Sequence, residues 1–400
     1  MALNTKKNQL KFKKTLFSLV LVLIYSFTFF INKETVTSLN PTPGSIIITA
    51  DKPHQFTKDT IFSEDVFFEA GSIIKIADSV DLVFKGNVTV AGTKNSRVTF
   101  KPIDKKWGHL RFNSNKKTAH IFNYTSLHNG KILFEEKAKV ELQNVMFKHT
   151  AQLKYWDGLF VMRFGTLKAD SITMLGNNSG EGIVVSSLDT ATVTNSHFQK
   201  INDAVEFLHC HNGSVENCFF EGNNHDDGID LNGCQNIIIQ NNIFKNIHDR
   251  CLEIGLHSYY KNPSLNIIVL NNHFEKSKIA IQVKEGTEMY AGYNTIENCK
   301  YAVEISDSAS VLKMYNSLIF HTTSRLILTK DTLYNLEWSA CISDSILTPP
   351  NNCNTQSKSE MSHCNLKASK LSKLLKIDSS KVGIQEKHLT IDIKQVSQLK

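Results

Sequence analysis

Carboxylate side chains recur in the middle of this chain at a spacing that could bring them together. The segments NDAVEF, DDGIDL and DRCLEI place Glu206, Asp230 and Glu253 between apolar residues, and IAIQVK and YAVEIS place Gln282 and Glu304 in the same setting. Alternating apolar and polar residues are typical of strands with one buried face. If such strands stack in parallel, their outward side chains form a row with about 4.8 Å between neighbours.

The turn before each strand adds further ionisable side chains. They are Asp203 before the first strand, His225, Asp226 and Asp227 before the second, and His248, Asp249 and Arg250 before the third. Like charges this close raise one another's pKa unless a cation or a basic group intervenes. The predicted site therefore consists of candidate catalytic residues Asp226, Asp227, Asp230 and Arg250, with His225, His248 and Lys284 as candidate substrate-binding residues.

Three chemistries fit this set of residues. A calcium ion takes about six to eight oxygen ligands, and Glu206, Asp230 and Glu253 could supply some of them. Paired carboxylates could hydrolyse a glycosidic bond: on neighbouring coils their separation is close to the roughly 5 Å of retaining enzymes, and a wider pairing gives that of inverting ones. Alternatively, a cation could neutralise a uronate carboxylate while Arg250, Lys245 or Lys284 helps to remove the C5 proton, which is β-elimination. The structural alternative is that Asp-Gly and Asn-Asp-Asp only form turns and that the outward acids are solvated.

A repeated phrase positions these residues. Its leading asparagines are 22, 24, 30, 23 and 22 residues apart, at Asn195, Asn217, Asn241, Asn271, Asn294 and Asn316. Such a period indicates a solenoid, and the alternation within each unit predicts an all-β, single-stranded parallel β-helix. The phenylalanines at equivalent places should stack inside, and the asparagines should form a side-chain ladder at a turn; the phenylalanines are Phe198, Phe220, Phe244 and Phe274. A β-sandwich does not predict an Asn-x-x-Phe phrase repeated in register.

The N-terminal segment predicts export. Residues 16–31 are uncharged and apolar and follow a lysine-rich stretch, which is typical of a secretory signal peptide or a signal anchor. The β-helix would then lie outside the cytoplasm, either secreted or tethered to the membrane. The predicted parts are a basic tail with the signal or anchor at 1–33, a linker at 34–45, the β-helix at 46–348, and a C-terminal cap with a Lys/Ser-rich tail at 349–400.

Charge and cysteine content narrow the choice of partners. Six of the 45 basic residues precede the first acidic residue, which leaves only +1 of the net charge of +7 for the rest of the chain. This balance argues against nucleic-acid binding. The eight cysteines would be exported, where disulfides are stable. Cys210 and Cys234 should stack on adjacent coils, either as a bridge or as buried thiols.

The repeats also carry a family resemblance. NSHFQKINDAVEF, NCFFEGNNHDDGIDL and NNIFKNIHDRCLEIG resemble repeats of the pectin-lyase-like superfamily of right-handed parallel β-helix proteins. The resemblance implies a right-handed coil over about residues 46–348, with similar motifs over about 195–306. NNHDDGIDL is similar to the Asp-rich segment of polygalacturonases and implies catalysis by Asp226, Asp227 and Asp230. The Gly-His-Gly and Arg-x-Lys segments of those enzymes do not occur in this chain, and IHDRCLEIG is more similar to generic β-helix repeats of exported proteins.

Together these features predict an exported right-handed parallel β-helix that binds or acts on acidic polysaccharide. As an enzyme it would be a lyase or a glycoside hydrolase, with calcium as the candidate cofactor and a membrane contact only if the N-terminal segment is not cleaved. The alternative is a non-catalytic surface module that binds glycan or protein. Outward aromatic side chains such as Trp156, Tyr259 and Tyr260 would favour sugar stacking if they line one groove.

Overall fold

The computed structural model describes residues 39–154, 157–256, 262–328, 335–339 and 342–343. Its regular structure consists entirely of strands within these ranges, from β1 at Ile46 to β36 at Ser343. A helix with the length and apolar character of a membrane span is absent from them. The chain divides into two units, Met1–Asn40 and Pro41–Lys400, and every strand belongs to the second. The predicted signal segment at 1–33 and the predicted cap at 349–400 lie outside the described residues.

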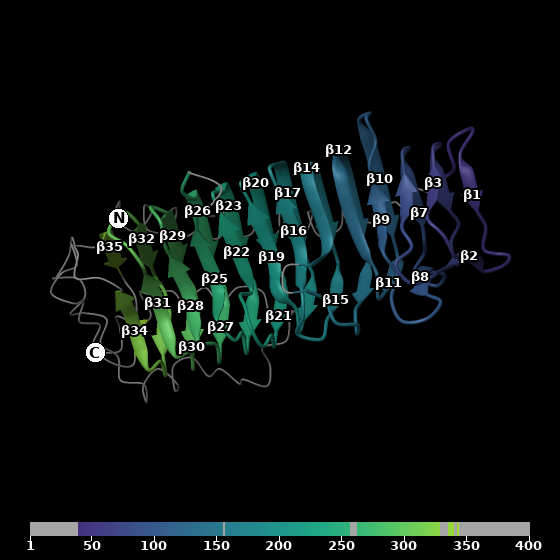
Figure 1. Ribbon diagram of the computed structural model, residues 1–400. Coiled ribbons are helices and arrows are strands. Elements are labelled where there is room, and N and C mark those ends of the chain that lie inside the picture. Colours follow the sequence, from purple (N-terminus) through teal and green to yellow (C-terminus); the bar gives the residue numbers. More distant parts are fainter. Residues whose placement is uncertain (1–38, 155–156, 257–261, 329–334, 340–341, 344–400) are drawn as a thin grey trace, which may run out of the picture. The chain divides into compact units, whose positions relative to one another are not determined.

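The strands form a parallel β-solenoid in which each coil contributes one strand to each of three faces (Figure 1). Face 1 contains β1 (Ile46–Ile48), β4 (Val66–Phe68), β7 (Val88–Ala91), β10 (Thr118–Asn123), the second halves of β12 (Lys131–Gln143) and β14 (Gly158–Asp170), β17 (Leu188–Thr194), β20 (His211–Glu216), β23 (Gln235–Gln240), β26 (Leu265–Leu270), β29 (Glu288–Gly292), β32 (Val311–Tyr315) and β35 (Asn335–Ser339).

Face 2 is a separate 13-stranded sheet. It contains β2 (His54–Phe56), β5 (Ile73–Ile76), β8 (Val98–Pro102), β11 (Thr125–His128), β13 (Met146–Lys148), β15 (Thr173–Leu175), β18 (His197–Gln199), β21 (Phe219–Glu221), β24 (Ile243–Lys245), β27 (His273–Glu275), β30 (Thr295–Glu297), β33 (Leu318–Phe320) and β36 (Ile342–Ser343).

Face 3 carries the candidate site. It contains β3 (Thr60–Phe62), β6 (Leu82–Phe84), β9 (His109–Phe112), the first halves of β12 and β14, β16 (Glu181–Ser186), β19 (Asn202–Leu208), β22 (Ile229–Asn232), β25 (Arg250–Gly255), β28 (Ile279–Val283), β31 (Tyr301–Ile305) and β34 (Ser324–Leu328). Because β12 and β14 run across both faces, face 1 and face 3 form one 23-stranded sheet.

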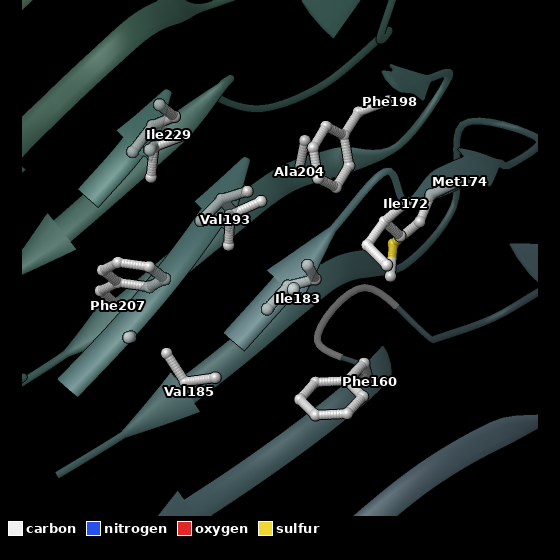
Figure 2. Packing of buried hydrophobic residues seen from close by; sticks show 14 of the residues in the cluster. Phe160, Ile172, Met174, Ile183, Val185, Val193, Phe198, Ala204, Phe207 and Ile229 are labelled. Carbon is white, nitrogen blue, oxygen red and sulfur yellow. The ribbon is translucent and has the colours of Figure 1, made fainter. Parts of the chain in front are cut away.

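The core lies between the three faces. Side chains such as Ile183, Phe198 and Phe207 point from different strands into a common interior (Figure 2). The predicted phenylalanine stack is confirmed on face 2, where ring centroids of successive coils are 5.0, 4.6 and 5.1 Å apart along Phe198, Phe220, Phe244 and Phe274. These rings are close to parallel, since their planes differ by at most 15°. In-register stacking of identical side chains therefore helps to fix the register of neighbouring coils.

Asparagine marks the corner between face 1 and face 2. The leading asparagines have positive φ, between 47° and 57°, at Asn195, Asn217, Asn241, Asn271 and Asn316. Asparagine tolerates this left-handed conformation better than most residues do. The predicted side-chain ladder forms between Asn271 and Asn241, whose Nδ2 and Oδ1 atoms are 2.8 Å apart.

The prediction was wrong by one residue in the fifth repeat. Tyr293 occupies its left-handed corner, with φ of 56°. Asn294 instead belongs to a second, fully internal ladder with Asn242 and Asn272, in which each Nδ2 donates to the Oδ1 of the next coil at 3.0 and 3.1 Å. We call these three residues the buried amide ladder.

The described cysteines are free and buried: Cys210, Cys218, Cys234, Cys251 and Cys299. Of the two arrangements expected for Cys210 and Cys234, the structure has stacked thiols on adjacent coils. Cys341, Cys353 and Cys364 lie outside the described residues.

Candidate functional site

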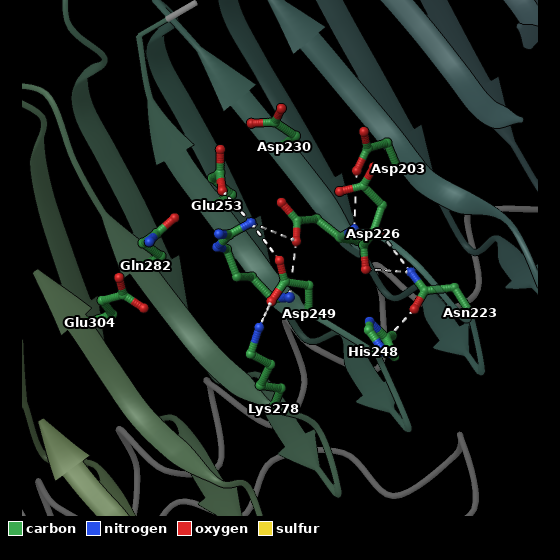
Figure 3. A network of polar contacts seen from close by, with 12 residues as sticks. Asp203, Asn223, Asp226, Asp230, His248, Asp249, Glu253, Lys278, Gln282 and Glu304 are labelled. Carbon is green, nitrogen blue, oxygen red and sulfur yellow. Dashed lines mark hydrogen bonds and ion pairs between the residues drawn. The ribbon is translucent and has the colours of Figure 1, made fainter. Parts of the chain in front are cut away.

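The predicted row of polar side chains is present on face 3. Glu206, Asp230, Glu253, Gln282 and Glu304 are successive Cα partners in β19, β22, β25, β28 and β31. We call these five residues the outward row, and Figure 3 shows four of them, Asp230 to Glu304, on neighbouring strands. The positions before and after the row are Val184 and Ile327, so polar side chains occupy five consecutive coils between apolar ones.

Asp230 has an incompletely satisfied carboxyl group. Its Oδ2 accepts a hydrogen bond from Asn232 Nδ2 at 2.7 Å, whereas its Oδ1 is buried and has no hydrogen-bond partner among the described residues. Burial raises the pKa of Asp230 well above its usual range, and the neighbouring charges of Glu253 and Glu206 raise it further. The surroundings of Asp230 therefore favour its protonated form more than those of an ordinary aspartate do.

Glu253, on the next coil, has positively charged side chains as its neighbours. Its Oε2 is 2.8 Å from Arg250 Nη1, and its Oε1 contacts Lys284 Nζ, although its side chain is only 9% exposed. Two cationic partners stabilise the ionised form of a buried carboxylate. The structure thus brings the predicted residues Arg250 and Lys284 to the row, where both contact Glu253.

Arg250 also connects the row to the preceding turns. The same Nη1 is 2.8 Å from Asp249 Oδ2 and 3.6 Å from Asp227 Oδ1. Burial lowers the pKa of Arg250, but Asp227, Glu253 and Asp249 outweigh this effect and raise it. A guanidinium held by three carboxylates remains charged and is a poor candidate for a base.

Aspartates gather at the start of β19 and in the turn before β22, so Asp203 lies within its strand and not before it as the sequence predicted. The carboxyl oxygens of Asp203, Asp226 and Asp227 lie within 4.8 Å of one another, and we call these residues the aspartate triad. Asp203 Oδ1 accepts the Asp227 N–H at 3.1 Å, and Asp227 Oδ1 accepts the Arg250 N–H at 2.9 Å. Both aspartates are buried, and burial is the main reason that their pKa values lie well above the usual range. Two members of the triad thus join successive coils as well as offering oxygens to a cation.

The predicted calcium ligands are arranged differently from this triad. Glu206, Asp230 and Glu253 follow one another along the row, but Arg250 and Lys284 already contact Glu253. The aspartate triad is the closest grouping of potential metal ligands in the described part of the chain. Its carboxylate oxygens are ligands of the kind that calcium prefers.

Glu181 is a site residue that sequence reasoning missed. Burial, followed by the charges of Asp203 and Asp226, raises the pKa of Glu181 to about 8. Burial and the charge of Glu181 likewise raise the pKa of Glu206 to about 8. A β-bulge between Glu181 and Ile183 displaces Glu181 from the alternating pattern. Its only signal in the sequence is an acidic residue beside the glycines of the segment GEGIVV.

The predicted histidines lie at the edge of the site. His225 and His248 are exposed, and their ring centroids are 6.1 Å apart on neighbouring turns. Asn223 holds these turns together, since its Nδ2 donates to the carbonyls of Asp226 and Asp227 at 2.7 and 3.1 Å and its Oδ1 accepts the His248 N–H at 2.8 Å. The aromatic residues expected to stack on sugar, Trp156, Tyr259 and Tyr260, lie outside the described residues.

The comparison with family models agrees with this geometry at the level of the fold. The family model of the right-handed β-helix region matches residues 130–283 and 181–341, which together span more than half of the chain. No curated protein matches the sequence. Among solved structures, the chain is similar to PfbA, a surface adhesin of Streptococcus pneumoniae, with 11% identity and a TM-score of 0.34 over 68% of this chain and 81% of that chain.

Proposed function

This chain belongs to the right-handed β-helix family, and we propose that it hydrolyses glycosidic bonds of a polysaccharide bound along face 3. The predicted fold, a right-handed parallel β-helix, is confirmed by the family match and by the parallel coils. The proposal depends on one observation: Asp230 and Glu253, Cα partners on adjacent coils, have contrasting surroundings, with burial and like charges acting on Asp230 and two cationic contacts on Glu253.

Glycoside hydrolysis needs such a pair. A neutral carboxylic acid donates a proton to the leaving oxygen, while an ionised carboxylate stabilises or attacks the sugar carbon. Asp230 fits the first role, because burial raises its pKa and so favours the protonated form, and because its Oδ1 has no partner in the described part of the chain. Glu253 fits the second, because Arg250 and Lys284 stabilise its negative charge.

The spacing favours one stereochemical outcome. Side chains on adjacent parallel strands are about 4.8 Å apart, close to the roughly 5 Å between the carboxyl groups of retaining glycosidases. We therefore expect retention of the anomeric configuration.

The geometry favours hydrolysis over β-elimination. A lyase needs a neutral base near the C5 proton of a uronate. Arg250 contacts three carboxylates, and Lys284 contacts Glu253, with its pKa raised by that partner and by Asp230 despite burial. Both side chains are therefore protonated and engaged.

The test is an assay of residues 40–400 on a panel of neutral and acidic polysaccharides, following reducing ends and unsaturated products in parallel. We expect reducing ends without unsaturation and a loss of about 10²- to 10⁴-fold in the Asp230→Asn variant, the usual contribution of a general acid. Glu304→Gln, three coils from Asp230 along the same row, is the matched control and should retain activity. Unsaturated products, or full activity in Asp230→Asn, would contradict the proposal. Glycan binding without any turnover would instead favour the non-catalytic surface module.

A second candidate function is calcium-dependent binding of an acidic glycan at the aspartate triad. The observation that favours it is the approach of three carboxylates to within 4.8 Å. Uronates would be repelled by these acids unless a cation lay between them. Calcium should therefore raise the melting temperature of the wild type and not that of Asp226→Asn, with Glu304→Gln behaving like the wild type. If calcium raised the melting temperature of Asp226→Asn as much as that of the wild type, the aspartate triad would not be the calcium site.

Export remains part of the proposal, supported by the uncharged segment 16–31 after its lysine-rich flank. Fractionation of cells expressing the full chain should place the β-helix outside the cytoplasm. Recovery in the cytoplasm would contradict this.

A further inference from the structure

Gln282 is a buried member of the outward row to which neither the hydrolysis nor the calcium proposal gives a role. It is only 4% exposed, and its Cα partners are Glu253 and Glu304. An uncharged amide thus interrupts a row of carboxyl groups directly beside the proposed reaction centre.

The orientation of the Gln282 amide follows from its neighbours. Ser306 Oγ donates to Glu304 Oε1 at 3.4 Å, because a carboxylate can only accept. The Ser306 hydroxyl therefore accepts the hydrogen bond from Gln282 Nε2 at 3.3 Å. The amide oxygen of Gln282 must then face away from Ser306, and Figure 3 shows Gln282 between Glu253 and Glu304.

This oxygen has no hydrogen-bond partner in the described part of the chain, although it is buried. A buried acceptor without a donor costs about 1–3 kcal/mol. It lies one coil from Glu253 and two coils from Asp230, whose Oδ1 is also without a partner there. A ligand that brings a hydrogen-bond donor to this place would remove the cost.

We propose that Gln282 Oε1 accepts a hydrogen bond from a hydroxyl group of a neutral sugar residue, and that the substrate of this site is therefore a neutral polysaccharide. The inference rests on the proposed hydrolysis at Asp230 and Glu253. It departs from the acidic glycan predicted from the sequence.

Charge supports a neutral substrate at this position. A uronate residue also carries hydroxyl donors, but it would bring its carboxylate beside the carboxylates of Glu253 and Glu304. A hydroxyl supplies the missing donor without adding charge. The nearby cations do not alter this preference, since Arg250 and Lys284 are already paired with Glu253.

The experiment measures binding and turnover separately. For binding, neutral and uronate oligosaccharides of equal length are titrated into residues 40–400 carrying Asp230→Asn, with and without Gln282→Leu. For turnover, KM and kcat of the Gln282→Leu single variant are compared with those of the wild type. We expect Gln282→Leu to weaken binding of the neutral oligosaccharide about tenfold, as expected for one lost hydrogen bond. Its melting temperature should equal or exceed that of the wild type, because an unsatisfied acceptor has been removed. Ser306→Ala removes the contact that orients the amide but keeps its oxygen, so it should weaken binding of the neutral oligosaccharide less than Gln282→Leu does.

The possible outcomes separate the two proposals. Turnover of uronate polymers only, or unchanged neutral-sugar binding in Gln282→Leu, overturns this inference while hydrolysis can stand. Gln282-dependent binding of neutral sugar without turnover supports the inference and overturns the proposed hydrolysis. A strong loss of stability in Gln282→Leu would show a structural role instead, and failure to bind any oligosaccharide overturns both proposals.

Discussion

Neighbouring carboxyl groups on face 3 have different electrostatic surroundings. Asp230 and Glu253 are Cα partners, yet the cations Arg250 and Lys284 contact Glu253, while burial and like charges dominate at Asp230. Such a difference in surroundings distinguishes the proposed acid, Asp230, from the carboxylate proposed to stabilise or attack the sugar carbon, Glu253, more firmly than the residue types alone do. Arg250 is a positioning residue in this arrangement, because its guanidinium contacts the carboxylate of Glu253.

The first prediction concerns the alkaline limb of the pH–rate profile. Above about pH 8 the carboxyl group of Glu206 ionises, and its charge further raises the pKa of Asp230. Glu206→Gln removes this charge, so Asp230 should lose its proton at lower pH. The alkaline limb should then move to lower pH, with activity near pH 5 retained. An unshifted limb would mean that Glu206 does not act on Asp230.

The second prediction concerns stability. The pKa of Glu181 is about 8 in the folded chain against 4.5 for a free side chain. The folded state therefore binds this proton more tightly, and stability falls as pH rises from about 4.5 to about 8. Glu181→Gln cannot ionise and should be more stable than the wild type at pH 9, on the order of 2 kcal/mol, with little gain at pH 4.5.

Urea unfolding at the two pH values measures this difference. The exposed acid Asp189 provides a control, because Asp189→Asn should show no such pH-dependent gain. Equal effects of Glu181→Gln at both pH values would contradict the assignment.

Site residues that follow the alternation of apolar and polar residues could be predicted from the sequence, whereas those that depart from it could not. The outward row was predictable because apolar residues flank each of its members. Glu181 was not, because a bulge places it beside Asn202. The role of Gln282 was not predictable either, since it depends on which way Ser306 directs its hydroxyl proton.

At the scale of the element, asparagines stabilise this solenoid in two ways. Those at the corners adopt positive φ, whereas those of the buried amide ladder satisfy backbone groups in the core. Asn272 Nδ2 donates to the Ile239 carbonyl at 3.0 Å, and its Oδ1 accepts the Asn242 N–H at 3.0 Å. Each ladder residue thus joins three coils.

The third prediction compares a buried with an exposed asparagine. Asn272→Ala leaves buried polar groups without partners and should cost about 2–4 kcal/mol. Asn266→Gly removes a similar contact, Nδ2 to Asn236 Oδ1 at 2.7 Å, but on the exposed surface, and glycine accepts the positive φ of 56° at this position, so it should cost less than about 1 kcal/mol. Denaturant unfolding of both variants measures the difference. Equal losses would mean that burial does not determine the strength of these ladders.

The one-residue difference at Tyr293 has a physical reason. Repeat spacing alone aligned Asn294 with the corner asparagines, but the structure places Asn294 in the buried amide ladder. Both positions accept asparagine, one for its backbone conformation and the other for its amide group. A sequence pattern cannot separate the two without knowing where each turn ends.

At the scale of the whole β-helix, each coil contacts mainly the coils before and after it. The phenylalanine stack on face 2 is one continuous example of these contacts. In solenoids stability is approximately a sum of such neighbour terms. The solenoid class was predictable because the repeat occurs along the chain, while the position of each cation relative to each carboxylate depends on side chains from several coils.

The fourth prediction concerns how far a defect spreads. Phe220→Ala should cost about 3–5 kcal/mol, because Phe220 is fully buried between Phe198 and Phe244. Hydrogen exchange should accelerate mainly in β18, β21 and β24 and little in β4 to β8. Phe219→Ala, at the adjacent outward position, should change exchange much less. Uniform acceleration along the whole β-helix would show that it unfolds as one unit.

The most direct test of the central claim is a crystal structure of the Asp230→Asn variant with a neutral oligosaccharide. The account predicts a sugar chain across β22, β25 and β28, with a glycosidic oxygen beside position 230 and a hydroxyl hydrogen-bonded to Gln282 Oε1. An oligosaccharide bound on face 1 or face 2, or on face 3 with no glycosidic bond near Glu253, would contradict it.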